Sequence, residues 1–82
     1  MAEKHSVYLL RSLKTGESYT GLTSNFDRRL TEHNAGQNPS TARARPWELA
    51  ALIELPREET AVKLERYLKS GSGRAFAKRH LE

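Results

Sequence analysis

The chain has 82 residues, a length that allows one small domain, because two separate cores of about 40 residues each would rarely fold without disulfides or metals. It contains no cysteine, which excludes disulfides, thiolate metal sites and a cysteine nucleophile. Lys and Arg number 14 against 10 Asp and Glu, for a net charge of +4, and no apolar run approaches the roughly 20 residues of a membrane-spanning helix.

Two strands joined by a turn are predicted near the start of the chain. Residues 6–11 begin with β-branched and aromatic side chains, and residues 17–22 have the character of a returning strand. Between them, Gly16 can adopt the positive φ that a tight turn requires. Such a hairpin places Tyr8 and Tyr19 on opposite arms, where their side chains can be close in space.

A helix, a loop and a third strand are predicted next. Ser24 begins a capping-box pattern, so a helix is expected from there to about Asn34. Residues 37–46 form a polar loop with two prolines. The alternation of residues 47–55 predicts a half-buried strand. The side chains expected to share its apolar face are Trp47, Leu49, Ala51, Ile53 and Leu55.

Two helices are predicted to complete the chain. Pro56 suits the first turn of a helix that continues to about Lys69. Ser72 is placed to cap a short final helix over residues 74–80. The order strand, strand, helix, strand, helix, helix predicts a single small α+β domain that spans residues 1–82.

Charged side chains lie on or beside the apolar stripes of the predicted helices. Arg29 and His33 are four residues apart, so they project together from the edge of the face that should be buried. Glu65 falls inside an apolar stripe, where a carboxylate must be paired, hydrogen-bonded or bound to a cation. One interpretation is an ion pair between Arg29 and Glu65 with His33 as a hydrogen-bonding neighbour, and the other is a functional site.

Two phenols near Arg, His and Glu side chains also fit phosphodiester chemistry. A carboxylate can hold a hard divalent cation such as Mg²⁺. A phenol can accept the proton of an attacking water when nearby cations lower its pKa, and an arginine can stabilise the developing phosphate charge. Ordinary strand packing is the alternative explanation for Tyr8 and Tyr19.

An ordered set of short motifs covers nearly the whole chain, roughly residues 5 to 78. Its members are Ser6-Val7-Tyr8, Tyr19-Thr20-Gly21, residues 28–36, residues 41–43 with 45–49, and Glu65 followed by residues 67–74. Together they resemble the GIY-YIG nuclease superfamily, in particular its small stand-alone bacterial members. The chain departs from that pattern at Ser6, which replaces the first glycine, and it lacks the late asparagine that some members carry.

The resemblance implies a three-stranded antiparallel sheet flanked by helices, and a metal-dependent endonuclease that hydrolyses phosphodiester bonds. One Mg²⁺ or Mn²⁺ ion would be held by Glu65. Tyr8 and Tyr19 would match the two motif tyrosines, one of which acts as general base or positions the water. Arg29 would face the scissile phosphate, and His33 would assist proton transfer or orient a tyrosine.

The expected substrate is DNA, including branched or flapped forms in repair or recombination, with RNA left open. The entire charge excess lies in residues 66–82, which carry five basic residues against one acidic residue. Solvation of a helical face or of a mobile loop is the alternative role for these charges. The residues expected to contact nucleic acid are Gly21, where the backbone allows close approach, and Thr41, Arg43, Arg45, Lys69, Arg74, Lys78 and Arg79.

The sequence is also compatible with functions other than catalysis. The chain could instead be a nucleic-acid-binding module of the same fold with little or no cleavage, or a protein–protein adaptor. A separate protein partner could supply targeting. No secretory signal is recognised in residues 1–12, so a cytoplasmic protein without a membrane partner is expected.

Overall fold

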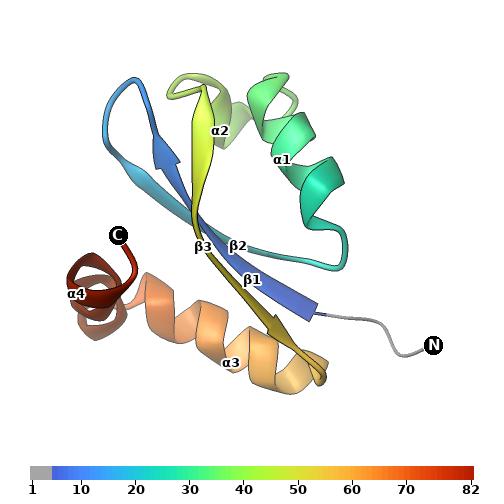
Figure 1. Ribbon diagram of the computed structural model, residues 1–82, viewed down its shortest axis with the longest axis vertical. Coiled ribbons are helices and arrows are strands. Elements are labelled where there is room, and N and C mark those ends of the chain that lie inside the picture. Colours follow the sequence, from blue (N-terminus) through green and yellow to red (C-terminus); the bar gives the residue numbers. More distant parts are fainter. Residues whose placement is uncertain (1–4) are drawn as a thin grey trace.

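The computed structural model describes residues 5–82 as a three-stranded antiparallel sheet with helices on both faces (Figure 1). The strand order is β2-β1-β3, so the first strand of the chain is the central one. This confirms the predicted α+β class, although the predicted domain begins at residues 1–4, which lie outside the described part. The elements are β1 (His5–Ser12), β2 (Ser18–Thr23), α1 (Phe26–Asn34), α2 (Pro39–Ala42), β3 (Trp47–Leu55), α3 (Glu58–Lys69) and α4 (Gly71–His80).

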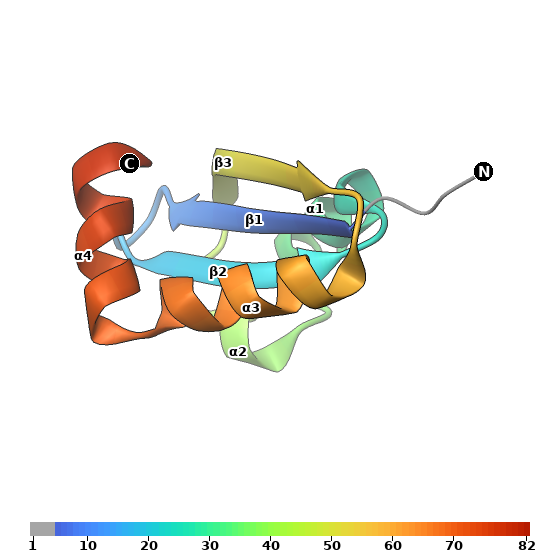
Figure 2. The same cartoon turned by 90° about the horizontal axis from the view of Figure 1, so that it is seen from below.

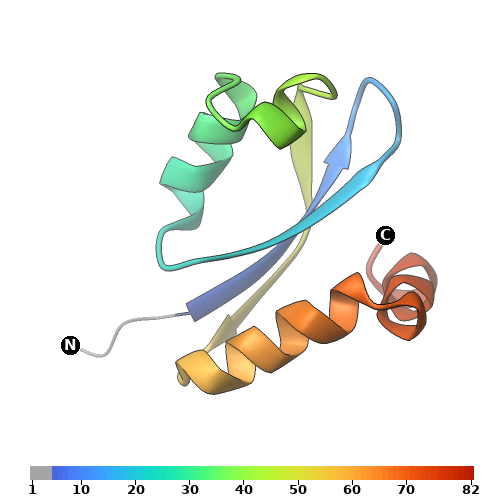
Figure 3. The ribbon, with the colours of Figure 1, turned by 180° about the vertical axis from the view of Figure 1, so that it is seen from behind.

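The central strand β1 supplies buried side chains to both faces of the sheet, because successive residues of a strand point in opposite directions. Val7 and Leu9 pack against buried residues of α3 and α4. Tyr8 and Leu10 point the other way, toward Trp47 and the apolar side of α1. Figure 3 shows this division, with α1 and α2 on one side of the sheet and α3 on the other. In Figure 2, α3 runs along β2 and α4 crosses the end of the sheet.

The prediction that the apolar residues of β3 share one face is wrong. The register pairs Leu9 with Ala51 but Leu10 with Leu49, so Ala50 is an extra residue that forms an irregularity in the ladder. An extra residue reverses the alternation of side chains along a strand. Trp47 therefore lies in the core beside α1, Ala51 lies beside α3, and Leu49 is 41% exposed.

Two helix starts also differ from the prediction. The side chain of Asn25, and not that of Ser24, accepts a hydrogen bond from the backbone N–H of Arg28 and caps α1. Ser70 caps α4 by accepting from the N–H of Gly73, so this helix begins three residues earlier than expected. The early start depends on a close reversal of the chain, because a Cβ at Gly73 would collide with the end of α3.

The β1–β2 hairpin and the helices α1 and α3 are bounded by glycine and proline residues that the sequence signals. Gly16 (φ +80°) closes the hairpin and Gly36 (φ +79°) follows α1, both in the left-handed region that favours glycine. Pro56 precedes α3, which begins two residues later at Glu58. None of the helices in residues 5–82 combines the length and apolar character needed to cross a lipid bilayer.

Candidate active site

The two predicted site tyrosines meet on the face of the sheet that is covered by α1. In the β1–β2 ladder, Tyr8 lies opposite Gly21 and Leu10 lies opposite Tyr19, so all four residues share one face. The Tyr8 and Tyr19 rings have centroids 6.2 Å apart. Tyr8 is fully buried, while Tyr19 is half-buried at the edge of the sheet. The hairpin therefore places two phenols side by side in different environments.

Gly21 leaves the space that the Tyr8 ring occupies. A Cβ built on Gly21 would lie 2.2 Å from the Tyr8 hydroxyl oxygen and 2.3 Å from the ring carbon that bears it. Only glycine, which has no Cβ, lets the phenol extend across the backbone of β2 at this position. The close approach expected at Gly21 is thus made by a side chain of the same chain. It is not a surface left open for nucleic acid.

A chain of buried hydrogen bonds runs away from the Tyr8 hydroxyl. The Tyr8 oxygen is 3.0 Å from His33 Nε2, and His33 Nδ1 is 2.7 Å from Thr41 Oγ1. The Thr41 hydroxyl donates in turn to the main-chain oxygen of Asn38, 3.4 Å away. His33 and Thr41 are both 0% exposed, so these polar atoms depend on one another for hydrogen bonds.

The hydrogen bond from Thr41 to Asn38 favours one tautomer of the His33 ring. A carbonyl oxygen only accepts, so the Thr41 hydroxyl gives its proton to Asn38 and its oxygen accepts from His33 Nδ1–H. His33 Nε2 then carries the lone pair and accepts from the Tyr8 hydroxyl. The Tyr8 oxygen is left with its own lone pairs free to accept a further proton.

The prediction that Thr41 contacts phosphate is wrong, because the residue is completely buried. Its role is to hold His33, and α2 holds Thr41 in place. The Trp47 indole N–H donates to the Thr41 main-chain oxygen at 2.9 Å. The Asn34 side chain binds the main chain of Trp47, accepting from its N–H at 2.7 Å and donating to its carbonyl at 3.2 Å.

Sequence reasoning missed the structural parts played by Asn34 and Asn38 and the helix α2. One signal for α2 was readable, since Asn38 followed by Pro39 is a typical cap and first residue of a helix. The contacts of Asn34 join residues 13 positions apart, and no local pattern indicates them.

Burial and neighbouring charges keep Tyr8 and His33 uncharged near neutral pH. Burial raises the pKa of Tyr8 far above its ordinary value of 10, and Tyr19 raises it further. Arg29 lowers this pKa, while the carboxylates of Glu65 and Glu32 raise it. Burial lowers the pKa of His33, Arg29 lowers it further, and Glu32 opposes them. Tyr8 is therefore a neutral phenol that donates to a neutral imidazole.

Arg29 and Glu65 do not form the ion pair with each other that the sequence left open. Arg29 Nη1 lies 3.3 Å from Glu32 Oε1, one helical turn away, and Glu65 Oε2 lies 3.3 Å from Lys69 Nζ. Pairs of this kind on a helix surface contribute a few tenths of a kcal/mol, so a ligand can displace them. Both groups are within electrostatic reach of Tyr8, because the Arg29 charge lowers the pKa of Tyr8 and the Glu65 charge raises it.

Glu65 is the residue that fits a divalent metal ion. Within residues 5–82, no three His, Cys, Asp or Glu side chains gather into a group that could hold a metal ion alone. Mg²⁺ needs no such cage, because it retains several waters and binds through one or two carboxylates together with substrate phosphates. The Glu65 side chain is 21% exposed, and its carboxylate supplies hard oxygen ligands within electrostatic reach of Tyr8. The residues present therefore fit a largely hydrated Mg²⁺ or Mn²⁺ ion.

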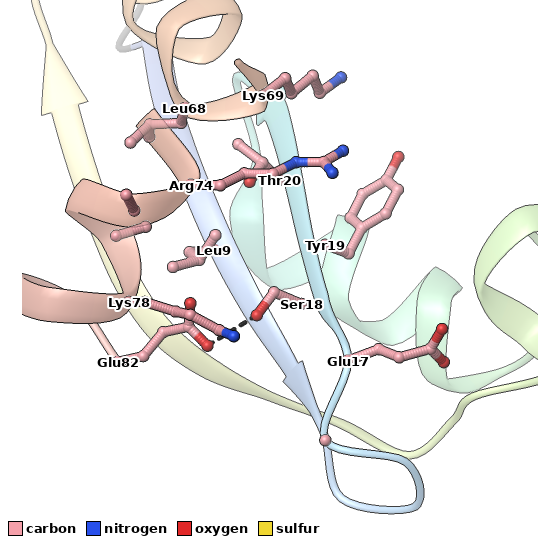
Figure 4. A pocket seen from close by; sticks show the side chains of 13 residues that line it. Leu9, Glu17, Ser18, Tyr19, Thr20, Leu68, Lys69, Arg74, Lys78 and Glu82 are labelled. Carbon is pink, nitrogen blue, oxygen red and sulfur yellow. Dashed lines mark hydrogen bonds between the residues drawn. The ribbon is translucent and has the colours of Figure 1, made fainter. Parts of the chain in front are cut away.

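The predicted basic contacts, apart from Arg79, fall into two groups. Arg43 and Arg45 lie on the loop side of the molecule, where Arg43 Nη2 is 3.7 Å from Glu17 Oε1 and the Arg45 guanidinium packs over Gly36. The second group borders a groove of about 620 Å³ beside Tyr19 (Figure 4). Its members are Lys69, Arg74 and Lys78, whereas Arg79 is exposed on α4 outside the groove.

Comparison with known proteins gives matches over most of the chain. The sequence profile described as the GIY-YIG catalytic domain matches residues 4–79. The chain is 38% identical over 71 residues to the UPF0213 protein BH0048 of Halalkalibacterium halodurans, a match that spans 85% of this chain and 74% of that protein. It is also 38% identical over 69 residues to the structure-specific endonuclease subunit SLX1 homolog of Leishmania infantum, spanning 74% of this chain and 10% of that protein.

A solved structure shows a similar fold. The solution NMR structure of the UPF0213 protein BH0048 from Bacillus halodurans superposes with a TM-score of 0.57 at 35% sequence identity. The superposition covers 93% of this chain and 81% of that chain.

Proposed function

Because the chain belongs to the GIY-YIG family of nucleases, we propose that it is a divalent-metal-dependent endonuclease that hydrolyses phosphodiester bonds in DNA. The observation that carries this proposal is the buried hydrogen bond from Tyr8 to His33, flanked by Arg29 and by the Glu65 carboxylate. The Leishmania relative is named as a subunit of a structure-specific endonuclease, which favours branched or flapped DNA as the substrate. Repair or recombination would present such DNA in the cytoplasm.

Tyr8 is the residue best placed to take the proton of the attacking water. Its hydroxyl already donates to His33 Nε2, so it can accept a proton from water while its own proton passes to the imidazole. The water oxygen forms a bond to phosphorus, and the bond from phosphorus to the leaving oxygen breaks. The leaving oxygen takes a proton from solvent, and the imidazolium of His33 later returns its proton through Tyr8.

This route explains how a phenol with a raised pKa can serve as a base. A free phenolate at Tyr8 is strongly disfavoured, because burial raises its pKa. Transfer of two protons together avoids that phenolate, and Thr41 stabilises the imidazolium by accepting from Nδ1. The Tyr19 hydroxyl makes no hydrogen bond within residues 5–82, and Tyr19 borders the groove, which suits contact with the substrate.

Arg29 and Glu65 complete the proposed machinery. The Arg29 side chain is 42% exposed and can turn from Glu32 to the phosphate oxygens, where a guanidinium stabilises the developing charge. Glu65 would hold the Mg²⁺ or Mn²⁺ ion, and such an ion stabilises phosphate charge as a Lewis acid. Lys69, released from Glu65, would then face the substrate backbone.

The decisive test is cleavage of labelled single-stranded, duplex, flap and junction DNA, with RNA alongside, in Mg²⁺, Mn²⁺ or EDTA. Wild type should cut only with metal, and Glu65→Gln should lose cutting. Glu58→Gln, an exposed change on the same helix, is the matched control and should cut normally. Equal cutting by wild type and Glu65→Gln would overturn the assignment of Glu65. Salt-sensitive binding without any cutting would instead indicate a binding module of the same fold.

A further inference from the structure

The groove beside Tyr19 joins an apolar floor to a polar, basic rim. The buried side chains of Leu9 and Leu68 form its floor, and its rim carries three cations, Lys69, Arg74 and Lys78. Tyr19 stands on the opposite wall, which is the edge strand β2. Figure 4 shows the Arg74 guanidinium and the Lys69 ammonium extending toward the side on which the Tyr19 hydroxyl lies.

The groove continues into the proposed active site. Lys69 belongs to both, because its ammonium pairs with Glu65 at 3.3 Å. Tyr19 also belongs to both, because its ring lies 6.2 Å from that of Tyr8. The floor of the groove lies on the α3 and α4 face of the sheet, opposite Tyr8, so a molecule bound there reaches the proposed site around the β2 edge, at Tyr19 and Lys69.

The charges of the groove are unequal along its length. Glu82 accepts a hydrogen bond from the Ser18 hydroxyl at 2.7 Å, and Glu17 lies on the same wall. These carboxylates oppose an anion at that end, whereas Lys69 and Arg74 attract one at the end beside the active site. Phosphate groups would consequently bind close to the proposed reaction centre.

We propose that this groove holds an unpaired stretch of the DNA strand next to the scissile phosphate, with its backbone on Lys69 and Arg74 and a base on the apolar floor. The volume of about 620 Å³ lies in the range of small-molecule pockets, about 300–1,000 Å³, and matches one or two nucleotides. A double helix cannot enter such a space, and its bases are already stacked and paired. Proteins bind single strands with basic side chains along the backbone and aromatic side chains that contact the bases.

This inference rests on the proposed nuclease function, and binding measured without cleavage keeps the two separable. Glu65→Gln protein in EDTA is titrated into fluorescein-labelled oligothymidylate, an equally charged abasic strand, and a duplex of the same length. Anisotropy gives each Kd. Oligothymidylate should bind about tenfold more tightly than the abasic strand, because the abasic strand has no bases to contact the groove.

The variant Lys69→Ala/Arg74→Ala should weaken oligothymidylate binding about tenfold and reduce the salt slope by about 1.4, or 0.7 for each lost phosphate contact. Lys63→Ala/Arg66→Ala removes the same charge from exposed positions of α3 outside the groove and should change Kd less than twofold. Equal weakening by the two double variants, or equal affinity for duplex and oligothymidylate, overturns the proposal. If these binding results hold while wild type fails to cut, the groove stands and the nuclease assignment fails.

Discussion

Replacing Gly21 by alanine tests the geometry of the site most directly. The added Cβ would lie 2.2 Å from the Tyr8 hydroxyl oxygen, whereas ordinary van der Waals contact begins near 3.4 Å. The difference, 3.4 − 2.2, is about 1.2 Å, so the phenol must move by at least that distance. Such a movement breaks the 3.0 Å hydrogen bond between Tyr8 and His33.

The stability cost follows from two terms. Overpacking a well-filled site costs about 1–3 kcal/mol, and leaving buried hydrogen-bonding groups unpaired costs about 1–3 kcal/mol more. The expected total is about 2–6 kcal/mol, which at roughly 4–8 °C per kcal/mol for a chain of this size is a fall in Tm of at least about 8 °C. Cleavage should fall about 100-fold, because a displacement of about 1 Å misplaces the reacting groups.

Thermal unfolding followed by circular dichroism, together with flap cleavage, measures both effects. Gly71→Ala is the matched control, because a Cβ at Gly71 meets no atom within 4 Å and should leave both measurements unchanged. In a Tyr8→Ala background, Gly21→Ala should cost almost nothing, because the atom it strikes is gone. A Gly21→Ala protein that melts within about 2–3 °C of wild type, which corresponds to a destabilisation of less than about 1 kcal/mol, would refute the reasoning.

Three other predictions concern the support of His33. Thr41→Val should leave His33 Nδ1 unpaired and lower the free energy of unfolding in urea by about 1–3 kcal/mol, whereas Thr41→Ser should stay near wild type. ¹⁵N NMR of the imidazole should show the Nδ1–H tautomer in wild type, and a protonated Nε2 would contradict the chain of hydrogen bonds. Because burial and Arg29 lower the pKa of folded His33, the unfolded chain takes up its proton first. The free energy of unfolding should therefore be constant above about pH 6.5 and fall below that pH by at most about 1.4 kcal/mol per pH unit. Tyr8, Tyr19, Arg29 and Glu32 also face the ring, so His33→Gln is the comparison. An equal slope in that variant would assign the effect to another group. Asn34→Ala should lower Tm by roughly 5–15 °C by removing two hydrogen bonds to Trp47, and an unchanged Tm would show that this contact is unimportant.

Local sequence signals predicted every strand and helix of this fold except α2, because such signals depend on nearby residues. The apolar and aromatic start of β1, the turn at Gly16 and the stripe around Glu65 each lie within one element. The reversal at Ala50 could not be predicted from alternation, because it is defined by the pairing of β3 with a strand 40 residues earlier.

The candidate site shows the same boundary between local and distant information. The helical spacing of Arg29 and His33 placed both side chains together at the edge of the buried face, but it did not identify their partners. Thr41 looked like an exposed loop residue, and only the position of α2 beneath Trp47 shows that it is buried against the imidazole. The ion-pair partners of Arg29 and Glu65 proved to be local, within one turn of their own helices.

The position of β1 at the centre of the sheet has a consequence for the order in which the molecule assembles during synthesis. The β1–β2 hairpin brings Tyr8 and Tyr19 together through contacts between near neighbours, which form within about 10 μs. The other edge of β1 stays unpaired until β3 has left the ribosome, because Ser12 pairs with Trp47, and β2, α1 and α2 lie between them in the chain. Trp47 also anchors Thr41, so the imidazole acquires its final orientation only at that later step. A nascent chain would thus display both tyrosines well before it could carry a proton away from them.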